Sequence, residues 1–272
     1  MILPKWVVQL KNKDMKFKVI ILAISLLAFI NASFGQTAHF TTSGVIEFEK
    51  TANMYAIFQK SITKDNESFL APAFEAFKKN QPQLKKLKSS LTFANNKTLF
   101  TPTDDDISIP GFFGNSAMIT QNNTIYTDVL AGTFIAQKRV FEENFLVRDS
   151  TRKIKWKITD ETREIAGFTC RRANALVLDS IYVVAFYTDK ITVSGGPESF
   201  TGLPGMILGL AIPHENVSWF ATKVTEKIVE TKDLTPPKKG KQVNNKGLKD
   251  TMLNALKDWG EYAKGYLKAF SL

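Results

Sequence analysis

The sequence predicts a mainly β protein of the β-rich α+β class, built on a curved antiparallel sheet or incomplete barrel. Short alternating runs of apolar and polar residues follow one another from residue 123 to residue 229, with turn residues between them. The connections are too short for helical crossovers, so successive strands are expected to pair antiparallel. A short helix in the N-terminal half and a C-terminal amphipathic helix complete the prediction.

The first elements follow from two different periods. Residues 44–50 alternate as a strand, which we expect to run on towards Phe58. Residues 66–79 instead hold Phe69, Phe74 and Phe77 at helical spacing, which predicts a short helix over 69–79.

The later strands are marked by alternation and turn residues. Residues 153–158 place three Lys on one face and Ile, Trp and Ile on the other, so they predict a strand of a sheet with one wet face. Residues 168–178 and 181–188 flank a tight turn and predict a hairpin, and residues 217–229 predict the last strand.

A glycine- and proline-rich stretch, residues 195–210, precedes the most apolar strand. Gly202, Leu203, Pro204 and Gly205 fit an architectural type II turn, in which Pro fixes φ at the second position and Gly supplies positive φ at the third. In the strand that follows, bulky side chains share one face, and Gly209 leaves the other face nearly bare. A close neighbour is therefore expected against the bare face.

The last part of the chain changes character. Residues 36–235 are predicted to form one β-rich domain, and residues 236–247 an exposed basic linker. Apolar residues then recur at steps of three and four, which predicts one amphipathic helix over residues 248–272, packed on the domain. The bare side of the sheet beside Gly209 is a candidate surface for it.

The beginning of the chain resembles an export signal. An apolar run at residues 19–30 follows Lys11, Lys13, Lys16 and Lys18 and precedes small residues. Residues 1–35 are therefore predicted to be a signal peptide cut after Gly35. Met15 would open a signal of ordinary proportions and is an alternative start. No Cys stands directly after the cut, at the new N-terminus, so we expect a soluble periplasmic or extracellular product rather than a lipid-anchored one, without a transmembrane segment.

The net charge and the cysteine content limit the partners and the disulfides that this chain can have. The chain has 272 residues and a net charge of +10; residues 1–35 hold five Lys and one Asp, so removing them leaves 31 basic and 25 acidic residues and a net charge of +6. This mild basicity, with export, argues against a nucleic-acid partner. Cys170 is the single cysteine, so an internal disulfide is excluded.

The sequence contains few candidate catalytic residues. His39 and His214 are the two histidines, and neither has a second His or a Cys nearby in the sequence, so no metal site is predicted. The sequence has neither a nucleophile elbow nor a phosphate-binding loop, and we assign no catalytic residue and no cofactor. Cys170 is a candidate reactive thiol, and a hydrolase or redox centre of Cys170 and His214 stays an alternative.

Three segments carry a resemblance to a known family. They are residues 202–207 (Gly-Leu-Pro-Gly-Met-Ile), 167–173 (Gly-Phe-Thr-Cys-Arg-Arg-Ala) and 185–191 (Ala-Phe-Tyr-Thr-Asp-Lys-Ile). The chain resembles the GLPGLI family of exported bacterial proteins, with Met206 in place of the usual Leu and Phe186 where a Trp is common. The resemblance implies that the protein is exported and has the predicted β-rich fold, and it carries no established biochemical activity.

These observations favour a non-catalytic binding protein of the bacterial envelope. We expect it to hold a hydrophobic small molecule or lipid, or to dock another envelope protein, with Phe112, Phe113, Trp156 and Phe200 as candidate ligand-binding residues. A structural surface protein that acts through its C-terminal helix is the other alternative.

Overall fold

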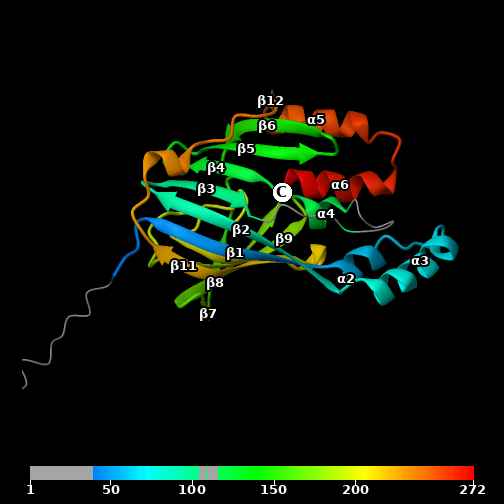
Figure 1. Ribbon diagram of the computed structural model, residues 1–272, viewed down its shortest axis with the longest axis horizontal. Coiled ribbons are helices and arrows are strands. Elements are labelled where there is room, and N and C mark those ends of the chain that lie inside the picture. Colours follow the sequence, from blue (N-terminus) through cyan, green and yellow to red (C-terminus); the bar gives the residue numbers. More distant parts are fainter. Residues whose placement is uncertain (1–38, 104–108, 110–115) are drawn as a thin grey trace, which may run out of the picture. The chain divides into compact units, whose positions relative to one another are not determined.

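A single sheet of twelve strands organises the chain in the computed structural model, which describes residues 39–103, 109 and 116–272 (Figure 1). The strand order is β12-β6-β5-β4-β3-β2-β1-β11-β10-β9-β8-β7, and the sheet is open, with β12 and β7 at its edges. Its strands are β1 (Gly44–Asn53), β2 (Leu84–Ala94), β3 (Lys97–Pro102), β4 (Thr124–Asp128), β5 (Thr133–Val140), β6 (Glu143–Ser150), β7 (Lys157–Ile165), β8 (Phe168–Val177), β9 (Ile181–Thr188), β10 (Met206–Ile212), β11 (Val217–Glu226) and β12 (Lys241–Val243).

Neighbouring strands pair antiparallel except β12, which runs parallel to β6. The predicted β-rich class and antiparallel sheet are confirmed, including the hairpin of β8 and β9. Consecutive strands are mostly neighbours, but β1 lies in the middle, between β2 and β11. The first strand of the chain therefore joins the two halves of the sheet.

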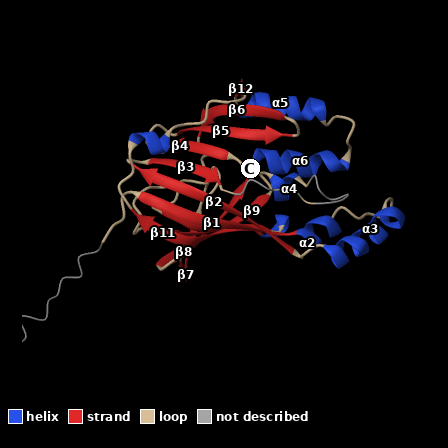
Figure 2. Cartoon of the chain, in the orientation of Figure 1, coloured by secondary structure: helices blue, strands red, loops and turns tan. Residues whose placement is uncertain are grey.

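Helices cover one face of the sheet and extend past the strand ends (Figure 2). They comprise α2 (Met54–Gln59), α3 (Glu67–Asn80), α4 (Ala117–Thr120), α5 (Asn245–Ala255) and α6 (Glu261–Ser271), with short 3-10 turns η1 (Pro213–Glu215) and η2 (Thr231–Leu234). In Figure 1, α6 lies between α5 and α4. Within the described part of the chain, none of the helices combines the length and hydropathy needed to span a bilayer.

Two predicted strands differ from the structure. Strand β1 ends at Asn53, because its side chain accepts a hydrogen bond from the Ala56 N–H (3.1 Å) and caps α2, so the predicted continuation towards Phe58 is wrong. Residues 153–156 alternate in exposure as predicted, but they belong to no strand, and the pairing of β7 with β8 begins only at Lys157. An alternating exposure pattern indicates which way the side chains point, but it does not require that the segment pairs with a neighbouring strand.

The Leu-Pro-Gly turn is tighter than predicted. The Gly205 N–H donates to the Leu203 carbonyl (2.8 Å), which closes a three-residue γ-turn around Pro204 in place of the four-residue type II turn. Gly205 has a φ of +136°, and a Cβ there would lie 2.1 Å from the Thr188 carbonyl oxygen. The glycine is required both by its φ and by the close approach of strand β9.

The bare face beside Gly209 is covered by the sheet's own side chains. A Cβ at Gly209 would lie 2.7 Å from the Phe220 ring and 2.9 Å from Ile165. The Arg163 guanidinium also lies over the Phe220 ring (4.8 Å). The close packing predicted for this face is present, but the C-terminal helix is on the other face of the sheet, against Lys138 of β5.

The C-terminal segment is also more divided than predicted. The single helix expected over 248–272 is two helices, α5 and α6, separated at residues 256–260, where Gly260 has φ +54° and ψ −132°. The segment 236–247, expected to be a linker, contributes strand β12 to the sheet edge. The break lets α6 turn back over the sheet face, which one straight helix could not do.

We expect Gly205→Ala to lower the free energy of unfolding by at least about 3 kcal/mol, because the new methyl group meets main-chain atoms and the residue keeps an unfavourable φ. Urea-induced unfolding measures the change. Gly265→Ala, in the interior of α6 with open space around it, is the matched control and should stabilise by about 1 kcal/mol. Similar stabilities for the two variants would contradict the steric account of the turn.

Candidate functional site

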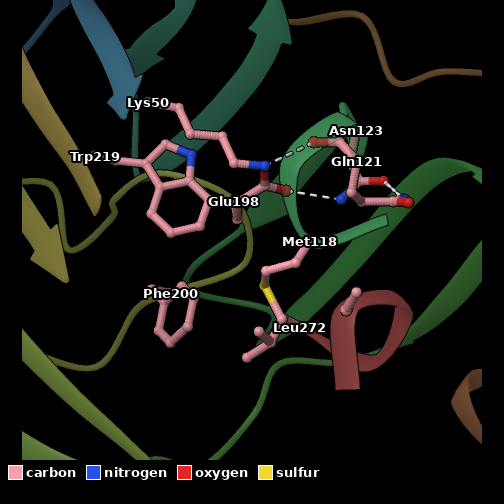
Figure 3. A pocket seen from close by; sticks show the side chains of 9 residues that line it. Lys50, Met118, Gln121, Asn123, Glu198, Phe200, Trp219 and Leu272 are labelled. Carbon is pink, nitrogen blue, oxygen red and sulfur yellow. Dashed lines mark hydrogen bonds between the residues drawn. The ribbon is translucent and has the colours of Figure 1, made fainter. Parts of the chain in front are cut away.

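A small cavity of about 20 Å³ lies between the sheet and helices α4 and α6, with room for about one water molecule (Figure 3). It is formed by side chains far apart in the sequence. Its polar lining is Lys50, Gln121, Asn123 and Glu198, and its apolar lining is Met118, Phe200, Trp219, Ala269 and Leu272.

Lys50 is buried because of its position on β1. The inward positions of this strand hold Ile46, Phe48 and Lys50 in turn, so the lysine points into the core. Its ammonium group donates to the main-chain oxygens of Ile119 (3.0 Å) and Gln121 (3.1 Å) and lies 5.2 Å from the centre of the Trp219 ring. Burial lowers the pKa of Lys50 to about 8, against the opposing effect of the Glu198 charge.

Glu198 approaches the same cavity from the loop between β9 and β10. Its carboxylate accepts a hydrogen bond from the Asn123 side-chain amide (2.8 Å), and Gln121 in turn donates to Asn123. Burial raises the pKa of Glu198, while Lys50, Asn123 and Lys138 act in the opposite direction. Glu198 also has a φ of +54°, an unfavourable conformation for a residue with a side chain, so its loop is held in place by the surrounding contacts.

Three donor groups bind the end of α6 next to this cavity. The Lys138 ammonium group donates to the Phe270 carbonyl (3.0 Å). The Arg152 guanidinium donates to the main-chain oxygens of Ser271 (2.8 Å) and Leu272 (3.2 Å), and the Ser199 hydroxyl donates to Leu272 (3.1 Å).

These donors are themselves removed from water. Burial lowers the pKa of Lys138 to about 8, with the Arg152 charge acting in the same direction. Arg152 also has a buried guanidinium nitrogen, Nη1, with no hydrogen-bond partner among the described residues. Its guanidinium lies 5.9 Å from the centre of the Phe200 ring, which lines the cavity.

The balance of buried charge at this site is positive. Lys50, Lys138 and Arg152 are cationic side chains, and Glu198 is the carboxylate that interacts with both lysines. Main-chain carbonyl oxygens, which carry only partial negative charge, compensate part of this excess. The arrangement can therefore hold an anionic group, and the described residues contain no cluster of three or more metal-ligating side chains.

The structure separates the predicted ligand-binding residues. Phe200 is buried and lines the cavity, whereas Trp156 is half-buried outside it and donates its indole N–H to the Thr201 carbonyl (2.9 Å). Phe112 and Phe113 lie outside the described residues. A Cβ added at Gly202 would lie 3.6 Å from the Trp156 indole nitrogen, so Trp156 lies beside the glycine-rich loop and supports it.

Cys170 and His214 are not brought together. Arg171 is paired with Tyr187, and Tyr187 with Ile207, so Cys170 lies level with the start of β10. His214 lies in η1, beyond the other end of β10, and the length of β10 alone separates the two by about 20 Å at 3.3 Å per residue.

The Cys170 thiol is fully buried and donates to the Phe168 carbonyl (3.4 Å). Burial first, and the Glu164 charge second, raise its pKa to about 12. A thiolate nucleophile is therefore disfavoured at neutral pH.

Sequence reasoning missed the charged residues of the site. Lys50 lies on the same face of its strand as Ile46 and Phe48. Lys138 likewise lies on the same face as Phe134 and Ala136. A charged residue at an inward position of an alternating strand is the signal that could have found both. No comparable signal marks Glu198, which lies in an irregular loop.

Comparisons with known proteins bear on the fold and on part of the glycine-rich region. A family model described as a protein of unknown function (Porph_ging) matches residues 176–209, which include two of the three segments that carry the family resemblance. Among curated proteins, none matches this chain.

Two solved structures of PNGF-II, in the P21 and C2 space groups, are similar to this chain. They match at 17% and 15% identity, each with a TM-score of 0.48, over 77% and 76% of this chain. The match covers 33% and 32% of those structures, so this chain spans about a third of their length.

Alkaline pH should reveal the buried lysines. Between pH 8 and 10.5 Lys50 loses its proton in the folded state while the unfolded state still holds it, so the free energy of unfolding rises with pH through this window. Lys50→Met should remove up to about 3 kcal/mol of that rise. Urea unfolding at pH 7.5, 9 and 10.5 measures it, with Lys223→Met at an exposed side chain as control. Equal pH dependence in all three proteins would contradict the burial of a charged Lys50.

The native thiol should resist labelling. We expect a thiol reagent at pH 7.5 to modify Cys170 only when the protein is unfolded, because the side chain is buried and its pKa is raised. The rate of modification with and without denaturant measures this. Rapid modification of the folded protein would revive the hydrolase or redox alternative centred on Cys170 and His214.

Proposed function

We propose that this chain is an exported, non-catalytic binding protein of the bacterial envelope. One observation carries the proposal: a group of buried charged side chains faces aromatic residues beneath a helix that is joined to the fold through a glycine. Perturbed pKa values in a concave, partly apolar site are typical of functional sites. The site holds donors and aromatic rings rather than an activated nucleophile, which favours binding over catalysis.

The export of the protein and its family membership are part of the same proposal. The chain is proposed to be a GLPGLI-family protein with residues 1–35 as its signal peptide, released into the periplasm or the extracellular space. The family match at residues 176–209 supports a likeness at the level of a family. The signal peptide itself lies outside the described residues.

The ligand is proposed to be a hydrophobic or envelope-derived small molecule. The cavity as it stands holds about one water molecule, so such a ligand requires α6 to move from the sheet face. Helix α6 packs on the core and on Phe141 through Tyr266 and Phe270. Its polar contacts are those of its end with Lys138, Arg152 and Ser199, an ion pair of Lys268 with Glu215 (2.8 Å) and a hydrogen bond of Tyr262 with Asn66. Gly260, at its beginning, supplies a hinge without steric contacts.

Trp219 allows the binding site to be located. We expect the protein purified from the envelope fraction to carry an organic molecule, detected by native mass spectrometry and removed by solvent extraction. Extraction should change the fluorescence of the wild type, and re-addition of the extract should reverse it. Trp219→Phe should reduce this response more than Trp259→Phe does, because Trp219 lines the cavity whereas Trp259 is half-exposed beside Phe141 and Tyr266.

Two results would contradict the carrier proposal. The first is a protein without bound mass and with unchanged fluorescence after extraction. The second is a response that depends on Trp259 and not on Trp219; it would favour the alternative in which the C-terminal helices dock another envelope protein.

A further inference from the structure

The side-chain groups that bind the end of α6 are of the kinds that recognise a carboxylate. A guanidinium, an ammonium and a hydroxyl, from Arg152, Lys138 and Ser199, converge on three consecutive main-chain oxygens. Guanidinium and ammonium groups bind a full negative charge more strongly than a neutral carbonyl. The Phe270 and Ser271 carbonyls therefore occupy Lys138 and Arg152 with weaker acceptors than these donors can take.

Arg152 provides a second, independent observation. Its Nη1 is buried without a partner among the described residues, while its Nη2 binds two oxygens of α6. A planar guanidinium can present two parallel N–H groups to one carboxylate. A ligand carboxylate at this position would satisfy a donor that α6 leaves unused.

The apolar surroundings define the rest of the ligand. The last turn of α6 buries Phe270 and Leu272 against the core. Trp219, Phe200 and Met118 line the adjoining cavity. If the last turn moves out, an apolar chain next to the donors would contact the surface that Phe270 and Leu272 now cover, and its burial would offset the loss of theirs.

We propose that the ligand is an amphiphilic carboxylate of the fatty-acid class, which exchanges with the last turn of α6. Its carboxylate takes the place of the Phe270, Ser271 and Leu272 main-chain oxygens at Lys138, Arg152 and Ser199. Its alkyl chain lies along Phe200 and Trp219. This inference rests on the proposed binding function and adds the chemical class of ligand. Helix and ligand compete for the same donors, so the ligand's apparent affinity depends on how readily α6 leaves.

The test compares ligands of equal chain length in the extracted, full-length protein. Dodecanoate, below its critical micelle concentration, should bind at least tenfold more tightly than dodecanol, measured by calorimetry and by Trp219 fluorescence. Arg152→Met should reduce dodecanoate binding to the level of dodecanol. Arg171→Met, whose side chain is 52% exposed, should leave the preference unchanged. Thermal unfolding checks that the variants fold, and Arg152→Lys, which keeps the charge and loses the planar fork, should retain an intermediate preference.

Loosening α6 tests the exchange itself. Lys268→Ala with Tyr262→Phe removes the ion pair with Glu215 and the hydrogen bond from Asn66 (2.8 Å), both away from the cavity. Dodecanoate should then bind about two- to fivefold more tightly. Unchanged or weaker binding in the folded variant would overturn the exchange.

The outcomes separate this inference from the proposed function. Equal binding of dodecanoate and dodecanol would overturn the carboxylate and leave a site for apolar ligands. Binding of neither, with a different molecule recovered from the envelope protein, would likewise overturn the inference and leave the binding function standing. Binding of neither, with no molecule recovered, would overturn both.

Discussion

Burial of positive charge is the constraint on which the interior of this protein depends. Lys50, Lys138 and Arg152 are covered by the sheet and its helices, and one carboxylate, Glu198, interacts with the two lysines. A buried charge without compensation costs several kcal/mol, so oxygen atoms must be supplied to it. Carbonyl groups at the ends of helices are suitable, because they have no partner within the helix. Those that serve here belong to Ile119 and Gln121 at α4, and to Phe270, Ser271 and Leu272 at α6.

The glycine-rich stretch serves this interior as well as the sheet. The γ-turn at Pro204 and the close approach of Gly205 to Thr188 set the start of β10 beside β9. The loop before the turn carries Glu198 and Phe200 into the cavity between sheet and helices. The turn is therefore architectural, and the groups of chemical interest lie a few residues before it.

The same contacts connect stability with the proposed function. Donors that hold the end of α6 stabilise the closed structure, and any anionic ligand at those donors must compete with the helix. A protein built only for stability would do better with apolar residues at these positions, because a well-packed apolar core avoids the cost of desolvating charge. The buried lysines and the strained φ of Glu198 are thus the features that the fold alone does not account for.

Local patterns in the sequence determined the antiparallel strands, the hairpin of β8 and β9, the helix α3 and the need for a close neighbour at Gly209, because side-chain period and turn residues act within a few residues. The tertiary structure alone decided that β1 lies between β2 and β11, that α6 turns back at Gly260, and that Phe220 and Ile165 cover Gly209. It also decided the candidate site. Lys50 and Glu198 meet only because strand order and register bring a central strand beneath the loop before β10, and no local period encodes such long-range pairing.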